Sequence, residues 1–153
     1  MQVAVELVDE RLNRGLASGY YFLFGEDTVG ETLGFSCFGP IACTASSYDL
    51  HWIAVHQSQR GKGPGRVLLA ETEKMIMALG GTRLYADTSG RSLYESTRKF
   101  YRKHGYGEDA VLRDFYGPGD DKVVFRKSLP VKALIPEQVP AATAGARVDR
   151  VAV

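Results

Sequence analysis

Three glycines and three cationic residues are interleaved in the short segment Arg60–Arg66. Because glycine has no Cβ, the backbone there can turn tightly and come close to a ligand. Residues 48–55 before the segment have the apolar content of a strand, and residues 67–79 after it space their apolar side chains as an amphipathic helix does. The first turn of a helix has unpaired N–H groups and the positive end of the helix dipole. The segment is therefore a predicted anion site, and a pyrophosphate fits it best.

Three kinds of glycine-rich phosphate loop differ in spacing. A P-loop needs a Lys-Ser or Lys-Thr pair after the glycines, and neither is present. The dinucleotide-binding pattern Gly-x-Gly-x-x-Gly needs its last glycine one position beyond Gly65. The segment fits Arg/Gln-x-x-Gly-x-Gly, and so resembles the acetyl-CoA pyrophosphate motif of the GNAT N-acetyltransferases. The resemblance implies that acetyl-CoA, as a co-substrate, is bound by Arg60, Gly61, Lys62, Gly63, Gly65 and Arg66.

A second segment carries the same resemblance. In the GNAT family the loop is followed by a long helix, a strand, and a second helix that ends in an aromatic-Tyr pair before Gly-aromatic. Here the helix at 67–79 precedes a predicted strand at 83–88, and Phe100-Tyr101 then precedes Gly105-Tyr106. The resemblance covers residues 15–129. It implies an α/β (α+β) fold, with a mixed, mostly antiparallel central sheet flanked by helices.

The resemblance also gives roles to residues outside the loop. Tyr101 stands at the position of the family's general acid, which protonates the departing thiolate. The amide of Ile53 is the implied oxyanion donor, and the backbone around Val55 is implied to pair with pantetheine like an added strand. Tyr94 stands where many relatives have an Asn that holds the pantetheine arm, so this contact differs here. Pro64 has no N–H to donate but suits the first position of a helix.

The acceptor amine must lose a proton before it can attack, because at pH 7 roughly one lysine-like amine in a thousand is neutral. A general base or an ordered water chain is therefore expected. Strand alternation places Asp49, His51, Ile53 and Val55 on one face. Partial burial raises a carboxylate's pKa, and a histidine already titrates near neutrality. Asp49 is the first choice for the base, with His51 and a water chain without a single base as the alternatives.

The composition is that of an ordinary globular domain, with 153 residues, 44% hydrophobic and 24% charged. The net charge of +1 gives no electrostatic case for nucleic acid or a membrane surface, and no apolar run could span a bilayer. Acidic residues near the N-terminus argue against a signal peptide, so a cytoplasmic location is expected. Cys37 and Cys43 are accordingly predicted to be two buried, reduced thiols, and no metal site is predicted.

The remaining segments predict a mixed order of elements. A turn-rich connection at 114–121 joins the last two strands, and the domain is predicted to end at residue 129. The Pro/Ala/Val-rich tail, residues 130–153, is predicted to be disordered. The predicted elements outside the two motifs are a helix at 3–16 and strands at 20–25, 32–38, 48–55, 110–113 and 122–127.

Compared with the family that it resembles, the predicted domain of residues 1–129 starts at a later element of the fold. GNAT domains open with a strand and a further helix, and both are expected to be missing here. The strand at 20–25 is then an exposed sheet edge, which favours pairing with another chain. A homodimer is the expected consequence.

The activity implied by the resemblance is transfer of an acetyl group from acetyl-CoA to a primary amine, by direct attack through a tetrahedral intermediate. The acceptor is expected to be a small-molecule or peptide amine, with residues 87–89 and 114–116 as candidates for its side of the site. The alternative is a non-catalytic acyl-CoA-binding or regulatory module. Such a module would keep the loop but would not need Tyr101 or Asp49.

Overall fold

The computed structural model describes residues 2–130 and 149–152. Its helices are α1 (Gln2–Arg14), α2 (Pro64–Ala78) and α3 (Glu95–Lys103), and short 3-10 helices occupy Gly15–Ser18, Gln57–Gln59 and Ser92–Tyr94. Its strands are β1 (Tyr21–Glu26), β2 (Thr32–Pro40), β3 (Ser47–Val55), β4 (Arg83–Ser89), β5 (Gly107–Gly117), β6 (Asp120–Ser128) and β7 (Asp149–Ala152).

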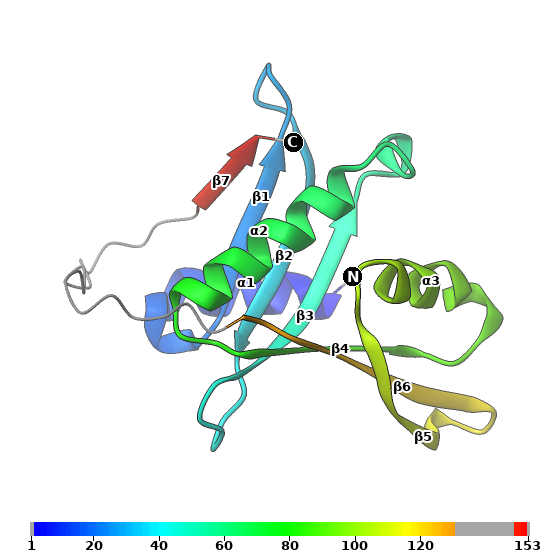
Figure 1. Cartoon of the computed structure of the whole chain (residues 1–153). Helices are drawn as coiled ribbons and strands as arrows, with labels where there is room; N and C mark the ends of the chain where they lie inside the picture. Colours follow the sequence, from blue (N-terminus) through cyan, green and yellow to red (C-terminus); the bar gives the residue numbers. More distant parts are fainter. Residues whose placement is uncertain (1, 131–148, 153) are drawn as a thin grey trace.

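The strands form one sheet in the order β5-β6-β4-β3-β2-β1-β7 (Figure 1). The pairs β3–β4 and β1–β7 are parallel, and the other neighbours are antiparallel. The predicted mixed, mostly antiparallel sheet with flanking helices is confirmed. No helix among the described residues is long and apolar enough to cross a membrane.

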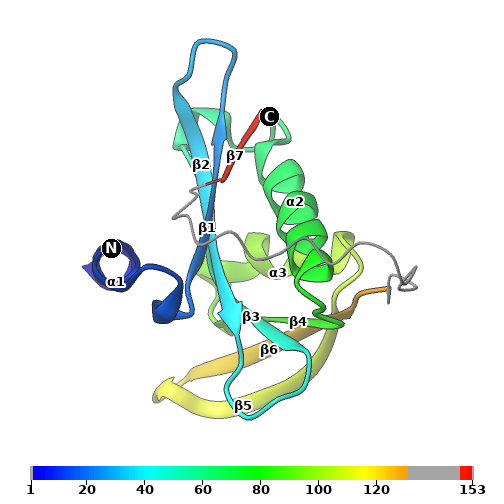
Figure 2. The ribbon, with the colours of Figure 1, turned by 90° about the vertical axis from the view of Figure 1, so that its left-hand side faces the viewer.

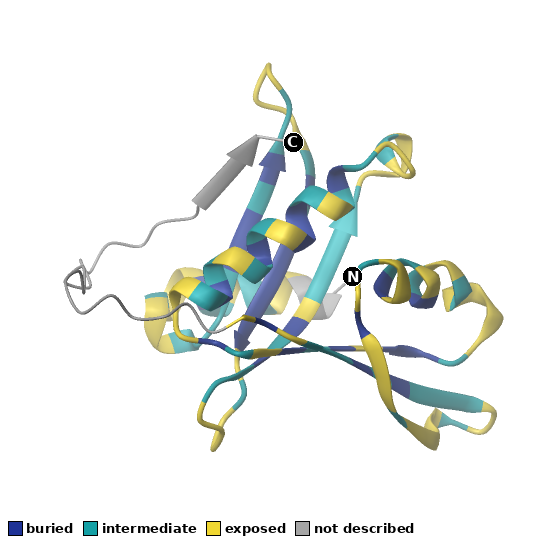
Figure 3. Cartoon of the chain, in the orientation of Figure 1, coloured by how far each residue is buried: buried dark blue, intermediate teal, exposed yellow. Residues whose placement is uncertain are grey.

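The helices lie on both faces of the sheet. Helix α2 crosses the face formed by β1, β2 and β3, and α1 lies on the opposite side of these strands (Figure 2). The main core lies beneath α2 and α3, where Phe38 and Phe125 of the sheet are fully buried. Figure 3 shows this buried band along the middle strands, while most of β5 at the sheet edge is exposed.

The spacing of buried residues explains why α2 forms and how it is oriented. Leu68, Leu69, Thr72 and Ile76 recur at helical intervals and are all buried against the sheet. The hydroxyls of Thr72 and Ser36 lie 2.7 Å apart, which joins α2 to β2 within the core. The helix begins at Pro64, three residues before the predicted start, since proline is well suited to the first turn.

Two predictions about the edges of the sheet are wrong. The segment 114–121 is not mainly a turn, because β5 continues to Gly117 and pairs there with Asp120 of β6. The β1 strand is not a free edge, because β7 pairs with it from Leu23 to Glu26. The argument for a homodimer from that edge is therefore weakened, and the homodimer stays a prediction. The tail, residues 130–153, is predicted to be disordered. Apart from Pro130 and β7, its residues lie outside the described part of the chain.

Both cysteines are free thiols, as predicted, but only one is buried. Cys37 is fully buried in β2, and burial raises its pKa to about 12. Cys43 lies in the exposed loop after β2 and was wrongly predicted to be buried. The loop has to turn back sharply there, and Cys43 adopts a left-handed φ of 61°.

Candidate active site

The central strand β3 contains a β-bulge at His51. Phe38 of β2 pairs with Leu50, and the preceding Cys37 pairs with Trp52, so His51 is an additional residue without a partner on β2. An additional residue reverses the alternation of side chains along a strand. The two halves of β3 therefore present opposite sets of side chains to each face of the sheet.

This reversal corrects the prediction that four alternate residues share a face. Before the bulge, Leu50 faces the core and Asp49 faces away from it. After the bulge, Ile53 and Val55 pack against that same core. Asp49 is thus on the opposite face from Ile53 and Val55, because an uninterrupted period of two does not hold across His51.

Strands β3 and β4 diverge at the bulge. Their parallel pairing runs from Ser47 with Arg83 to Leu50 with Ala86 and does not continue beyond (Figure 1). His56 donates its N–H to the Leu33 carbonyl of β2. Since successive strand residues turn their backbone groups to alternate edges, Ile53 and Val55 turn theirs away from β2.

The amides of Ile53 and Val55 therefore face the opening between β3 and β4. These are the two backbone positions for which the sequence predicted contacts to a thioester and a pantetheine arm. An extended ligand that entered the opening could pair with them as an added strand does.

The glycine-rich segment lies at the top of this opening, where β3 leads into α2. The N-cap residue Gly63 has a φ of 109°, a left-handed conformation that suits glycine. No side chain caps the helix, and its first turn contains no acidic residue. Among the described residues, the amides of Gly61, Gly63 and Gly65 donate to no protein acceptor. This end of α2 keeps unpaired donors and the positive end of its dipole.

Gly65 shows how closely the elements approach at the start of α2. A Cβ added there would lie 3.4 Å from Cγ2 of Val55 and 3.6 Å from Cε2 of Phe100. Strand β3, helix α2 and helix α3 thus meet at one point. The side chains of Arg60, Lys62 and Arg66 are exposed around it and can supply positive charge to an anion.

Tyr101 of α3 lies on the core side of the opening. It is 4% exposed and packs with its ring 5.4 Å from those of Tyr106 and Phe125. Its hydroxyl has no hydrogen bond within the described residues. Every fully buried polar side-chain atom of those residues does have a hydrogen-bond partner. The small exposed surface of Tyr101 must therefore include its hydroxyl. Burial, with the nearby charge of Asp87, raises the pKa of Tyr101, so the hydroxyl is protonated at neutral pH.

The loop from β4 to α3 is held by the buried side chain of Arg98. Its guanidinium donates to the carbonyls of Ser89 (2.6 Å) and Arg91 (2.9 Å) and to Glu95 (2.6 Å). Charge-assisted hydrogen bonds of this kind are stronger than neutral ones. They fix α3, and so the position of Tyr101, relative to the end of β4.

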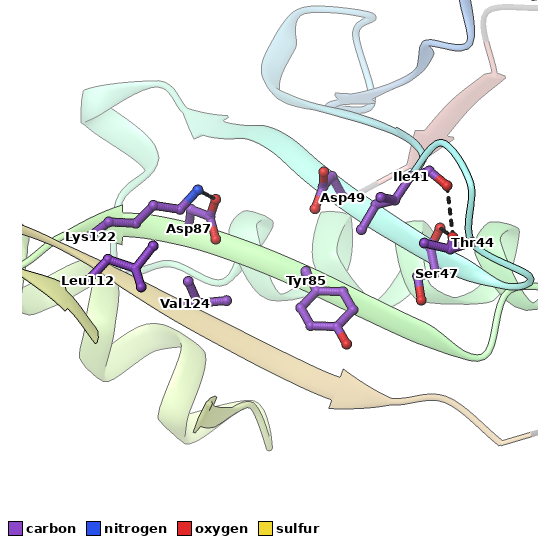
Figure 4. A pocket seen from close by; sticks show the side chains of 9 residues that line it. All are labelled: Ile41, Thr44, Ser47, Asp49, Tyr85, Asp87, Leu112, Lys122 and Val124. Atoms are coloured by element: carbon purple, nitrogen blue, oxygen red, sulfur yellow. Dashed lines mark hydrogen bonds and ion pairs between the residues drawn. The ribbon is translucent and has the colours of Figure 1, made fainter. Parts of the chain in front are cut away.

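A pocket of about 340 Å³ lies on the other face of the sheet, beside the diverging strands (Figure 4). Asp87 of β4 forms an ion pair with Lys122 of β6 at one end of it. Asp49 and Tyr85 lie between that pair and the loop after β2. Burial is the main cause that raises the pKa of Asp49, and the charge of Asp87 adds to it. Asp49 is therefore a stronger base than a free aspartate.

His51 does not line this pocket. Its ring makes an edge contact with Tyr20, at 5.3 Å between centroids, and its Nε2 lies near Gly39. Desolvation lowers the pKa of His51, so the neutral form is favoured. Asp49 and His51 are close enough to influence one another's pKa, but they are directed to different surroundings.

Tyr94 lies in the 3-10 turn before α3 and is 38% exposed.

No group of three or more His, Cys, Asp or Glu side chains suited to a metal ion occurs within the described ranges.

Comparison with known proteins identifies the family. The model of the acetyltransferase (GNAT) domain matches residues 17–108. A solved GNAT-family protein from Desulfovibrio desulfuricans is 45% identical, with a TM-score of 0.80 over 84% of this chain and 80% of that one. The chain belongs to the GNAT acetyltransferase family. No curated protein matched the sequence.

More distant acetyltransferase structures share the fold. An aminoglycoside 6'-N-acetyltransferase complexed with coenzyme A is 23% identical, with a TM-score of 0.69 over 83% of this chain and 80% of that one. The ribosomal-protein-S18-alanine N-acetyltransferase from Escherichia coli is 17% identical, with a TM-score of 0.57 over 69% and 67% of the two chains. At these identities the similarity concerns the fold alone.

Sequence reasoning missed two residues that line the pocket. Lys122 was assigned only to a closing strand, and Tyr85 only to the strand before α3. The alternation within β4 and β6, with Leu84, Ala86 and Phe125 in the core, would have placed both on the face of Asp87. The contact between Lys122 and Asp87 could not be found without the register of the two strands.

Proposed function

We propose that the chain is an acetyl-CoA-dependent N-acetyltransferase that acts on a primary amine by direct attack. One observation carries the proposal: an uncapped helix N-terminus, unpaired strand amides and a tyrosine hydroxyl surround the same divergence of β3 and β4. The unpaired amides before α2, with Arg60, Lys62 and Arg66, suit the pyrophosphate of a coenzyme A thioester. A fixed main-chain N–H, here that of Ile53, suits a developing oxyanion.

Bound acetyl-CoA would supply the electrophilic carbonyl carbon and the thiolate leaving group. Asp49 takes a proton from the ammonium, and the freed nitrogen forms a bond to that carbon. The carbonyl oxygen becomes an oxyanion, which accepts a hydrogen bond from the backbone N–H of Ile53. When the carbon–sulfur bond breaks, the Tyr101 hydroxyl gives its proton to the sulfur. The nitrogen then releases its second proton, which restores the tyrosine, and Asp49 returns the first proton to water.

Asp49 is the proposed base rather than His51 because its carboxylate lines the pocket beside Asp87, whereas His51 lies outside that pocket with its ring beside Tyr20 and Gly39. The raised pKa of Asp49 brings its basicity closer to that of the amine. A water chain could extend its reach to the ammonium.

The test is thiol release from acetyl-CoA with a panel of amines across a range of pH. Since the base must be deprotonated, kcat/KM should fall as the pH decreases through the raised pKa of Asp49. Asp49→Asn should remove this dependence and lower the rate by about 10²-fold or more. His51→Gln is the matched variant, and its kcat/KM should still fall as the pH decreases. If Asp49→Asn keeps the rate and His51→Gln loses it, the base has been misassigned.

Binding of coenzyme A without thiol release for any amine would favour the acyl-CoA-binding module instead. No measurable binding of coenzyme A would exclude both functions.

A further inference from the structure

The pocket of Figure 4 has an unusual balance of charge for a site that receives a cation. Two carboxylates, Asp49 and Asp87, face it together with one ammonium, that of Lys122. Lys122 forms an ion pair with Asp87, and this contact raises the pKa of the lysine, so its positive charge is retained. Asp49 is left as the one carboxylate of the pocket without an ion-pair partner among the described residues.

Two acidic residues of the β5–β6 hairpin are already in ion pairs. Asp120 pairs with Arg91 at 3.1 Å, and Asp121 pairs with Arg113 at 3.0 Å. The pocket therefore offers an incoming ligand one uncompensated negative charge.

Lys122 is held in place from a second side. Its ammonium lies 4.8 Å from the centre of the Phe115 ring of β5, in a cation–π contact. Its side chain is 21% exposed, so the charge stands at the rim of the pocket rather than in bulk water. A second ammonium brought to this rim would find Asp87 already paired with Lys122 and would gain no free carboxylate there.

The rest of the lining has no charged group and combines apolar surface with the hydroxyls of Thr44, Ser47 and Tyr85. Ile41, Leu112 and Val124 contribute aliphatic side chains, and Tyr85 contributes its ring. An ammonium placed on the aliphatic groups would lose part of its hydration without gaining a partner there. Methylene or aromatic carbon on the same groups would be stabilised by removal from water.

From this arrangement we propose that the acceptor is a monocationic primary amine carried on an apolar body, and that Lys122 excludes amines with a second positive charge. The ammonium lies at Asp49, and the apolar body covers Ile41, Leu112 and Val124. The inference rests on the proposed acetyltransferase function and adds its substrate class.

The test compares two acceptors of equal length in the thiol-release assay: hexylamine and 1,6-diaminohexane, which differ by one terminal ammonium. The wild type should prefer hexylamine by at least about tenfold in kcat/KM. Lys122→Met should reduce this preference to nearly unity, because the fixed positive charge is gone and Asp87 becomes free to pair with the second ammonium. Lys103→Met, an exposed lysine of α3, makes the same charge change away from the pocket and should leave the preference intact.

Equal or better use of the diamine by the wild type would overturn the inference, and so would a preference that Lys122→Met leaves unchanged. This result is distinct from failure of the proposed function, in which no amine releases thiol although coenzyme A binds. In that case the inference falls together with the function. Unchanged affinity of Lys122→Met for coenzyme A shows that the variant is folded, and the wild-type ranking alone already decides the substrate class.

Discussion

The two helices beside the divergence of β3 and β4 begin in different ways. Neither has a capping side chain, but α2 follows Gly63 with no acidic residue in its first turn and with unpaired amides ahead of it. Helix α3 follows a 3-10 turn in which the amides of Tyr94 and Glu95 already donate to carbonyls of Arg91 and Ser92. Glu95 adds a carboxylate to its first turn, and Arg98 binds that carboxylate.

The difference separates binding from positioning. A helix start whose donors and dipole are satisfied by its own protein gains stability and has nothing left for an anion. A start without these partners gives up that stability but keeps donors for a ligand. Under the proposed function, α2 is the helix whose start would receive the anion, and α3 supports Tyr101.

The largest expected effect is on the chemistry supported by α3. Tyr101→Phe should lower kcat by about 10²–10⁴-fold, because the departing thiolate loses its proton donor. The affinity for coenzyme A should remain within about twofold, because the ring and its packing are preserved. Steady-state rates and calorimetric titration measure the two quantities. An equal loss of affinity would mean that Tyr101 binds the ligand rather than serving the reaction.

A smaller effect is expected when the start of α2 is made to resemble that of α3. Gly65→Glu places a carboxylate and a side chain where the Cβ already meets Val55 and Phe100. The affinity for coenzyme A should fall by at least about tenfold, or 1.4 kcal/mol. Ala70→Glu adds the same charge at an exposed position further along α2 and should leave the affinity almost unchanged. If the two variants bind equally well, the start of α2 is not the anion site.

The smallest effect is expected at the start of α3. The hydrogen bond from Arg98 lowers the pKa of Glu95, so the pair stabilises the fold above the unfolded-state pKa of Glu95 and ceases to do so as the pH falls through the lowered value. Glu95→Gln should lower the melting temperature by about 2–4 °C at neutral pH, and the difference from wild type should shrink below about pH 4. Binding of coenzyme A should not change. A difference in melting temperature that is the same at both pH values would contradict this role of the ion pair.

Much of the fold follows from local sequence pattern. The glycines before α2 and the Phe100-Tyr101 pair before Gly105 lie in segments whose helices, strands and order are governed by hydrophobic periodicity and turn chemistry. These local signals predicted the glycine-rich segment before α2 and the helix that contains Tyr101, in the observed order.

The remainder depends on pairing between distant strands. The bulge at His51 exists because of the register of β2 against β3, and no local signal marked it. The contact of Lys122 with Asp87 depends likewise on the register of β6 against β4. The pairing of β7 with β1 joins segments more than a hundred residues apart. Long-range register of this kind is not encoded in the spacing of neighbouring residues.

The most direct test of the open start of α2 is the response of its backbone amides to coenzyme A in a ¹⁵N–¹H correlation spectrum. The amides of Gly61, Gly63 and Gly65 should shift strongly and become protected from solvent exchange on saturation, while the amide of Glu95 should shift little. Saturation with coenzyme A that leaves the three glycine amides unshifted and exchanging as before would contradict the account.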